Sequence, residues 1–197
     1  MVFEENMKNL CFYFLVLFLF VSCSYQKIQK EDIIQKKYDP IILNIYEYQL
    51  ILDKKNVTIP NFLGFDGSFL VTNLTEWGNK KIKVNGFENS LSMIIKSFSL
   101  EKKDIKKYKG IKKLFFSEEK VEYNLKIKIS LDFVQEDRTS KILNLSGNIS
   151  FFIDDSHSIN KKRDFLLSSY YELIRKVDKT LENEISKETF SKFRISL

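Results

Sequence analysis

The chain has 197 residues, with 32 Lys and Arg against 26 Asp and Glu, so its net charge at pH 7 is +6. This length provides one domain of ordinary size once a targeting segment is removed. Two cysteines and a single histidine exclude a disulfide framework, most zinc sites and most histidine-activated nucleophiles, so we expect a protein that is not an enzyme and needs no cofactor.

The N-terminal segment places Lys8, an unbroken apolar run over residues 10–21 and the pair Ser22-Cys23 in succession. The run has about 12 residues, whereas a helix needs about 20 apolar residues to span a bilayer. A short apolar run that ends at a small residue is typical of a secretory signal peptide. We predict a signal peptide over residues 1–22. An uncleaved anchoring helix is the alternative, and the polar sequence after Ser24 disfavours it.

The segment Phe20-Val21-Ser22-Cys23 resembles the lipobox of bacterial lipoproteins, with phenylalanine in the place of the usual leucine. The resemblance implies that the sulfur of Cys23 carries diacylglycerol and that its freed amine is acylated, typically with palmitate. The acidic pair Glu4-Glu5 departs from the basic start of a signal peptide. A start at Met7 would remove that pair and place Lys8 just before the apolar run, so we expect translation to begin at Met7, with Met1 as the alternative.

Cleavage after residue 22 would leave a basic, exported chain with 31 Lys and Arg against 24 Asp and Glu, a net charge of +7. Such a charge favours anionic lipid surfaces and phosphate groups, and export argues against a nucleic-acid partner. Position 24 carries serine instead of the aspartate that retains some lipoproteins in the inner membrane. This difference favours the outer membrane.

We expect residues 23–39 to form a flexible tether and residues 40–197 to form a single domain.

The first part of this domain changes from strand signals to helix signals. Pro40 precedes residues 41–52, which are rich in branched and aromatic side chains and are expected to form a strand. Residues 56–68 contain one proline and two glycines, which predict a long surface loop. A helix is expected over residues 69–84, which carry Leu70, Leu74, Trp77 and Lys81 at helical spacing.

The middle of the domain predicts three strands. Residues 87–100 regain strand character, and residues 121–133 alternate strictly between apolar and polar side chains, as expected of a sheet that is covered on one face. Residues 143–153 repeat the alternation after a polar turn, so the two segments form a hairpin. Gly147 lies on the apolar face and indicates either a β-bulge or a place where a helix backbone packs closely.

A long helix is predicted after Ser158, which is the expected N-cap. Its apolar residues form a single stripe that would cover the apolar face of the sheet; they are Leu166, Tyr170, Leu173, Ile174, Val177, Leu181 and Ile185. The predicted fold is α+β, a four-stranded and mostly antiparallel sheet with two helices on one face, in the order β-α-β-β-β-α.

The segment Gly110-Ile111-Lys112-Lys113-Leu114-Phe115, followed by a strand that contains Tyr123, is similar to a family of small proteobacterial lipoproteins of unknown function. The likeness covers roughly residues 77–193 and includes the long final helix. The order of elements also resembles that of the lipopolysaccharide-assembly outer-membrane lipoprotein. This second likeness concerns the fold, and no site residue transfers from either comparison.

The strongest local feature is a run of lysines between the second and third predicted strands. Lysines at this density would suit the phosphates of lipopolysaccharide or of anionic lipid headgroups, with a solvated lysine-rich loop as the alternative. The seven residues are Lys102, Lys103, Lys106, Lys107, Lys109, Lys112 and Lys113.

Three further residues are weighed as sites. Trp77 is expected in the core rather than as a binding anchor, and His157 is expected to be a solvated loop residue. The pair Asp154-Asp155 has no third carboxylate at metal-ligand spacing, so we expect its negative charge to stabilise the N-terminus of the helix that follows.

These features predict a lipid-anchored protein that faces the periplasm and acts as a binding or scaffolding module in envelope assembly. The alternative function is that of a carrier that encloses a lipid or another small apolar ligand. The expected partners are the membrane, through the N-terminal lipid, and either an outer-membrane protein complex or anionic lipid.

Overall fold

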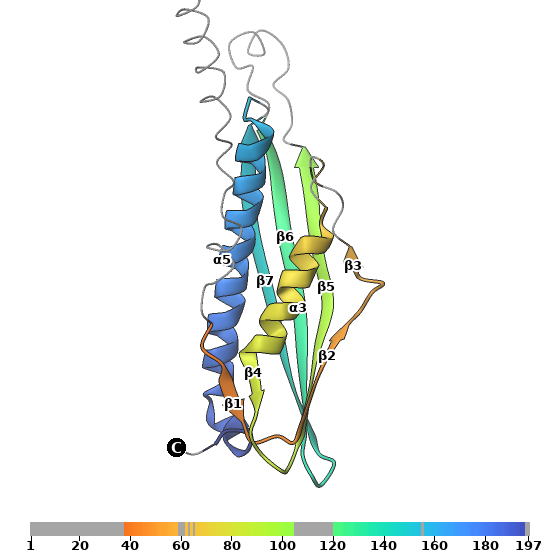
Figure 1. Ribbon diagram of the computed structural model, residues 1–197, viewed down its shortest axis with the longest axis vertical. Helices are drawn as coiled ribbons and strands as arrows, with labels where there is room; N and C mark the ends of the chain where they lie inside the picture. The colour runs from red at the N-terminus through yellow and green to blue at the C-terminus, as the bar shows by residue number, and fades with distance from the viewer. Residues whose placement is uncertain are drawn as a thin grey trace, which may run out of the picture. The chain divides into compact units, whose positions relative to one another are not determined.

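Three long strands form the centre of the fold (Figure 1). They are β5 (Ser90–Asp104), β6 (Lys120–Val134) and β7 (Ser140–Asp154), and each pairs antiparallel with the next. The alternation of apolar and polar residues sets their register, because the apolar side chains of β6 from Val121 to Leu131 oppose apolar residues or Gly147 on β7. The predicted hairpin is confirmed, and both strands are longer than predicted.

The computed structural model describes residues 38–58, 62, 64, 66–104, 120–154 and 156–195. The chain divides into two compact units, residues 1–37 and 38–197, and all the described residues belong to the second unit. The predicted signal peptide, the lipidation site Cys23 and the tether up to residue 37 lie outside the described residues.

Two short strands complete the main sheet on the free side of β5. Strand β2 (Glu47–Leu52) and strand β3 (Val57–Thr58) each pair with β5 in the parallel direction. The main path through the sheet therefore runs β2-β5-β6-β7. This arrangement confirms the predicted α+β class with a four-stranded, mostly antiparallel sheet.

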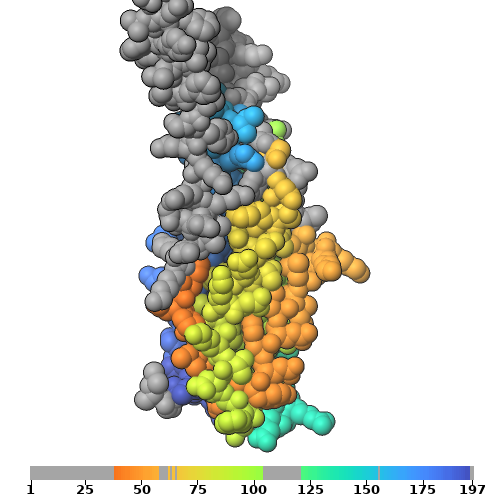
Figure 2. All heavy atoms as spheres, viewed as in Figure 1, coloured from red at the N-terminus to blue at the C-terminus, as the bar shows by residue number. Residues whose placement is uncertain are grey.

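Both long helices pack against one face of this sheet. Helix α3 (Ser68–Lys81) approaches it at Gly78, which lies beside Met93 of β5, and helix α5 (Ile159–Ile185) approaches it at Gly147 of β7. Met93 and Gly147 share a face, because the register places both in the apolar rows of their strands. The space-filling view shows the yellow side chains of α3 lying against the orange residues of β2 (Figure 2).

The start of α5 agrees with its predicted cap. The Ser158 hydroxyl oxygen accepts the N–H of Lys161 at 3.3 Å, which satisfies one of the unpaired donors of the first turn. A short 3-10 helix, η1 (Glu188–Phe193), follows α5 and packs Phe190 and Phe193 against Phe133 of β6.

The prediction of one continuous strand over residues 41–52 is wrong. Strand β1 (Ile41–Leu43) pairs in parallel with β4 (Ile82–Val84) in a separate two-stranded sheet, and β2 begins only at Glu47. The chain leaves the first sheet because the N–H of Asn44 donates to the carbonyl of Phe193 and that of Tyr46 to the carbonyl of Asn89. Both acceptors are distant in sequence.

The other boundaries also differ from prediction. The helix expected to reach residue 84 ends at Lys81, because residues 82–84 are extended and pair with β1. The strand expected from residue 87 begins at Ser90, because Asn89 has a φ of 64°, which interrupts an extended backbone. The predicted loop over 56–68 contains β3 and also Phe62, which is buried and packs edge-on against Tyr123 at 4.9 Å.

Side chains of α5 pack closely on Gly147 of β7. A Cβ atom at this position would lie 2.7 Å from Leu173 Cδ1, 2.9 Å from Val177 Cγ2 and 3.1 Å from Ile127 Cγ2. The pairing of β6 with β7 runs through Gly147 without a register shift. The predicted β-bulge is therefore wrong, and the glycine leaves room for side chains of α5 rather than for the helix backbone of the other prediction.

We expect Gly147→Ala to lower the free energy of unfolding by about 1–3 kcal/mol, because the added methyl group would push α5 away from β7. Urea unfolding followed by far-UV circular dichroism measures this change. The control is Ser146→Ala at the exposed neighbouring position, which we expect to shift stability by no more than about 0.5 kcal/mol. Equal stability of the two variants would contradict the close packing.

Candidate functional site

The predicted lysine cluster begins at the end of β5. Lys102 and Lys103 are the last two lysines of that strand and are exposed. The Nζ atom of Lys103 lies 3.4 Å from a carboxylate oxygen of Glu122 on β6. The other five members, Lys106, Lys107, Lys109, Lys112 and Lys113, lie outside the described residues.

The register of the sheet brings a second group of basic residues to this end of the molecule. Asp104 of β5 pairs with Val121 of β6, which pairs with Ile153 near the end of β7, and α5 begins shortly after. The first turns of α5 carry Lys161, Lys162 and Arg163. We call the set Lys102, Lys103, Lys161, Lys162 and Arg163 the basic end.

The charge at the start of α5 is opposite to the usual preference. The N-terminus of a helix carries a partial positive charge, so acidic side chains are favoured there, yet the first turn of α5 contains none. The local sequence therefore adds side-chain cations to an already positive helix end. Such an arrangement suits an anionic partner that approaches from solvent.

The acidic residues near the basic end already have partners. Glu101 pairs with Lys126 at 2.6 Å, and Glu122 lies 3.4 Å from Lys103. Asp154 is nearly buried, and its Oδ1 accepts the N–H of Ser156 at 2.9 Å. This contact supports the turn before α5, while the predicted effect of the pair on the helix N-terminus stays a prediction; Asp155 is not among the described residues.

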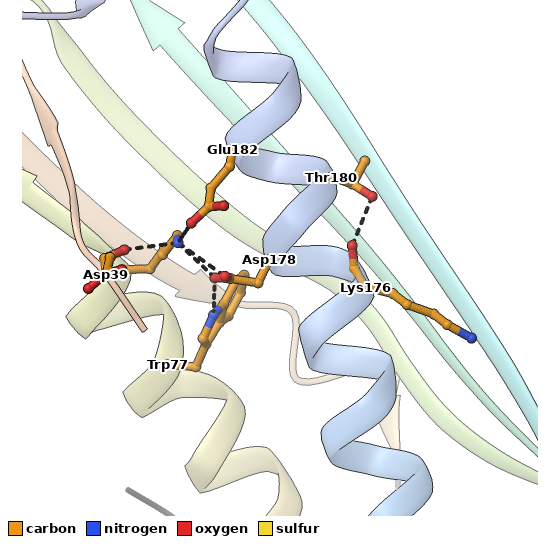
Figure 3. Close-up of polar contacts among 7 residues, drawn as sticks. Asp39, Trp77, Lys176, Asp178, Thr180 and Glu182 are labelled. Atoms are coloured by element: carbon orange, nitrogen blue, oxygen red, sulfur yellow. Dashed lines mark hydrogen bonds and ion pairs between the residues drawn. The ribbon is translucent and has the colours of Figure 1, made fainter. Parts of the chain in front are cut away.

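A separate cluster of charged side chains lies between α3 and α5 (Figure 3). Lys81, the last residue of α3, has a fully buried side chain. Its ammonium group donates to the carbonyl oxygen of Asp39 at 2.9 Å, to Asp178 at 3.1 Å and to Glu182 at 2.5 Å. An ammonium group has three donors, so all the hydrogen-bonding capacity of Lys81 is used.

Trp77 completes this cluster, which we call the Lys81 cluster. Its indole Nε1–H donates to Asp178 Oδ1 at 2.9 Å, and its ring is buried as predicted. Asp178 thus accepts from two residues of α3 that are one helical turn apart. Because each of these donors has an acceptor within the protein, the cluster connects the two helices.

Sequence reasoning placed Lys81 on the apolar stripe of the first helix but did not identify its partners. Those partners are 97 and 101 residues away along the chain. One signal was available, since a lysine on a buried stripe requires a carboxylate on the facing element. Asp178 and Glu182 stand one turn apart beside the apolar stripe of α5, and that spacing matches the requirement.

The expectation that His157 is a solvated loop residue is wrong. Its ring is half-buried and stacks on Phe165 of α5, with ring centroids 5.3 Å apart and an interplanar angle of 25°. Phe165 lies in the second turn of α5. The segment before the helix therefore folds back onto it, and the Phe165 ring covers one face of the imidazole. His157 is therefore part of the packing at the start of the helix.

In the described ranges, no three His, Cys, Asp or Glu side chains gather in a way that could hold a metal ion. None of the helices in the described part of the chain combines the length and the apolar character needed to cross a membrane.

Comparisons with known proteins give no family. No family model matches the chain, and no curated protein matches its sequence. Among solved structures, the chain is similar to rare lipoprotein B from Shewanella oneidensis, at 16% identity over 73% of this chain and 96% of that chain, with a TM-score of 0.38.

Two other solved structures are also similar. A minor lipoprotein from Acinetobacter baumannii is 7% identical over 70% of this chain and 93% of that chain, with a TM-score of 0.41. Lipoprotein GNA1162 from Neisseria meningitidis is 11% identical over 66% of this chain and 98% of that chain, with a TM-score of 0.24. At TM-scores and identities this low, the likenesses carry no argument about function.

We expect Asp178→Ala to destabilise the protein by about 3–5 kcal/mol, because it leaves a buried ammonium group and the Trp77 indole short of an acceptor. The double variant Lys81→Met/Asp178→Leu should recover part of this loss, since neither buried charge remains. Urea unfolding followed by the fluorescence of Trp77, the only tryptophan, measures both effects.

The matched control is Lys80→Met at the neighbouring position, where the lysine is exposed and forms a surface pair with Glu76 at 3.5 Å. It should change stability by no more than about 1 kcal/mol. A loss for Asp178→Ala no larger than that of the control would contradict the role of the Lys81 cluster.

Proposed function

We propose that this protein is a lipid-anchored lipoprotein of the bacterial envelope, and that it acts as a binding or scaffolding module rather than as an enzyme. The lipobox-like segment that ends at Cys23 supports the anchor, and Ser24, in the place of a retaining aspartate, favours the outer membrane. The basic end supports the binding role, because it gathers cations from β5 and α5 beside the connection that carries five more lysines. Its partner is the phosphate-bearing surface of anionic envelope lipid.

The length of the tether is compatible with this proposal. Fourteen residues separate Cys23 from Tyr38, where the described domain begins, and an extended chain of that length spans up to about 50 Å. The 15 residues of β5 also extend over about 50 Å. A domain tethered by lipid at Cys23 is therefore able to bring the basic end to the membrane that holds the lipid.

The packing of the domain favours binding at its surface over the enclosure of a ligand. Gly78 and Gly147 bring α3 and α5 so close to the sheet that an added Cβ atom would overlap side chains at both positions. A lipid chain between the sheet and the helices would have to separate these layers. It would also have to break the contacts of Lys81, which connect the helices. These features support a scaffold and count against a carrier.

The proposed lipid contact is tested with a form that lacks the anchor, residues 23–197 with Cys23→Ser, so that only the domain contributes to binding. We expect this form to float with vesicles that contain about one-third phosphatidylglycerol and not with pure phosphatidylcholine, and we expect salt to release it. Replacing Lys102, Lys103, Lys161 and Lys162, four of the five residues of the basic end, by Gln should weaken partitioning at least about tenfold, since each lysine near an anionic surface contributes about 1 kcal/mol.

The control for this experiment carries four Lys→Gln substitutions at exposed positions outside the basic end, Lys54, Lys55, Lys83 and Lys179. Both variants lose the same net charge, so a specific contact predicts retained binding in the control alone. Equal binding by the parent and both variants would contradict the proposal, and equal loss in both variants would show attraction by net charge without a defined surface.

A further inference from the structure

The basic end carries exposed apolar side chains as well as cations. Phe152, near the end of β7, is 54% exposed, and Ile159, the first residue of α5, is 58% exposed. They lie on the two sides of the turn that joins β7 to α5, in which the N–H of His157 donates to the carbonyl oxygen of Asp154 at 3.1 Å. Exposed apolar side chains that stand among lysines and arginines are typical of surfaces that bind membranes.

The register of the sheet places Phe152 at the level of the last lysines of β5 (Figure 1). Phe152 pairs with Glu122 of β6, and Glu122 pairs with Lys103 of β5. This row faces away from the helices, because it alternates with buried residues such as Ile153. Two strands with one strand between them are about 10 Å apart. Phe152 and Lys103 therefore stand about 10 Å apart on the same face of the sheet.

Ile159 lies next to the cations of α5 in the same way. Residues 159–165 contain three cations, Lys161, Lys162 and Arg163, and one acid, Asp164. Lysine and arginine side chains can keep their charged groups at the level of lipid phosphates while their aliphatic stems lie against apolar groups. The combination fits an anionic bilayer better than a soluble anion, because a soluble anion offers no apolar phase to Phe152 and Ile159.

We propose that Phe152 and Ile159 insert between the headgroups of an anionic bilayer while the cations of the basic end bind its phosphates. This inference rests on the proposed function and adds to it an apolar contact and an orientation. The long strands stand roughly along the bilayer normal, so their other ends are held up to about 50 Å from the surface.

The remainder of the open face favours this end-on orientation over a flat one. The lysines in the middle of β6, Lys126 and Lys128, also lie on this face. Their paired positions on both neighbouring strands carry small polar side chains, which gain nothing from an apolar phase. These residues are Ser97, Ser99, Ser146 and Asn148.

Ile142, at the other end of β7, is 60% exposed but differs from Phe152 in its surroundings. It lies ten residues away, about 33 Å along the strand. Its paired residue on β6 is Asp132, an acid that anionic lipid repels. Exposed apolar side chains and grouped cations therefore coincide at the basic end and not at the far end of β7.

A fluorescent probe at single cysteines tests the insertion. The form with residues 23–197 and Cys23→Ser is the whole predicted mature chain without its lipid, and it contains no cysteine. Phe152→Cys and Ile159→Cys are each labelled with the environment-sensitive probe NBD, and Ile142→Cys, on the same strand and the same face, is the matched control. The vesicles contain about one-third phosphatidylglycerol in phosphatidylcholine, as in the flotation experiment.

On binding to these vesicles, the probe at 152 and at 159 should gain intensity, shift its emission to shorter wavelength and be quenched by lipid that carries a nitroxide near the headgroup. The probe at 142 should keep its emission in water. Flotation without any shift at 152 and 159 would overturn the insertion and leave the charge contact of the proposed function standing. Equal shifts at all three positions would overturn the end-on orientation. A chain that does not float would contradict the proposed function and, with it, this inference.

A second pair of variants tests the apolar contact without a probe. Phe152→Ser/Ile159→Ser should weaken partitioning to the same vesicles about tenfold, since two half-exposed apolar side chains no longer leave water. The loss should be similar at low and at high salt, because salt screens charges and not apolar contacts. The matched control is Phe87→Ser/Ile142→Ser, which removes two exposed apolar side chains away from the basic end. Equal partitioning of the two double variants would overturn the proposal.

Discussion

The burial of the Lys81 ammonium group is the constraint on which the arrangement of the described domain depends. A buried cation must be paired and fully hydrogen-bonded, and Lys81 finds its three acceptors in three separate parts of the chain: Asp39, Asp178 and Glu182. Burial of apolar side chains is compatible with many positions of a helix on a sheet. The contacts of Lys81 form only when α3, α5 and the segment before β1 have one particular position and orientation relative to one another. The Lys81 cluster thus specifies the relative orientation of the helices, which hydrophobic contact alone defines less precisely.

Elements whose signals are local could be predicted from the sequence. The alternation along β6 and β7 reports directly which face is buried, and Ser158 identifies the start of α5 through its own side chain. The break between β1 and β2 could not be predicted, because it depends on backbone contacts of Asn44 and Tyr46 with remote residues. A propensity for extended structure describes both strands well but does not indicate which sheet each will join.

The candidate site likewise combines a feature that is visible in the sequence with one that depends on the fold. The density of lysines after β5 is visible in the sequence, whereas the contribution of α5 depends on the register that brings the ends of β5 and β7 together. The burial of Trp77 agrees with its predicted place in the core, whereas the stacking of His157 on Phe165 depends on the fold. The domain that results has closely packed layers and a charged end.

The chemical state of Cys23 in the cell tests the central claim, an envelope lipoprotein, most directly. Mass spectrometry of the N-terminal peptide of the membrane-bound protein should find a chain that begins at Cys23 and carries diacylglycerol on the sulfur and an acyl chain on the amine. Cys23→Ser should abolish this product and leave the uncleaved precursor. A wild-type chain that retains residues 1–22 and a free thiol at Cys23 would contradict the account.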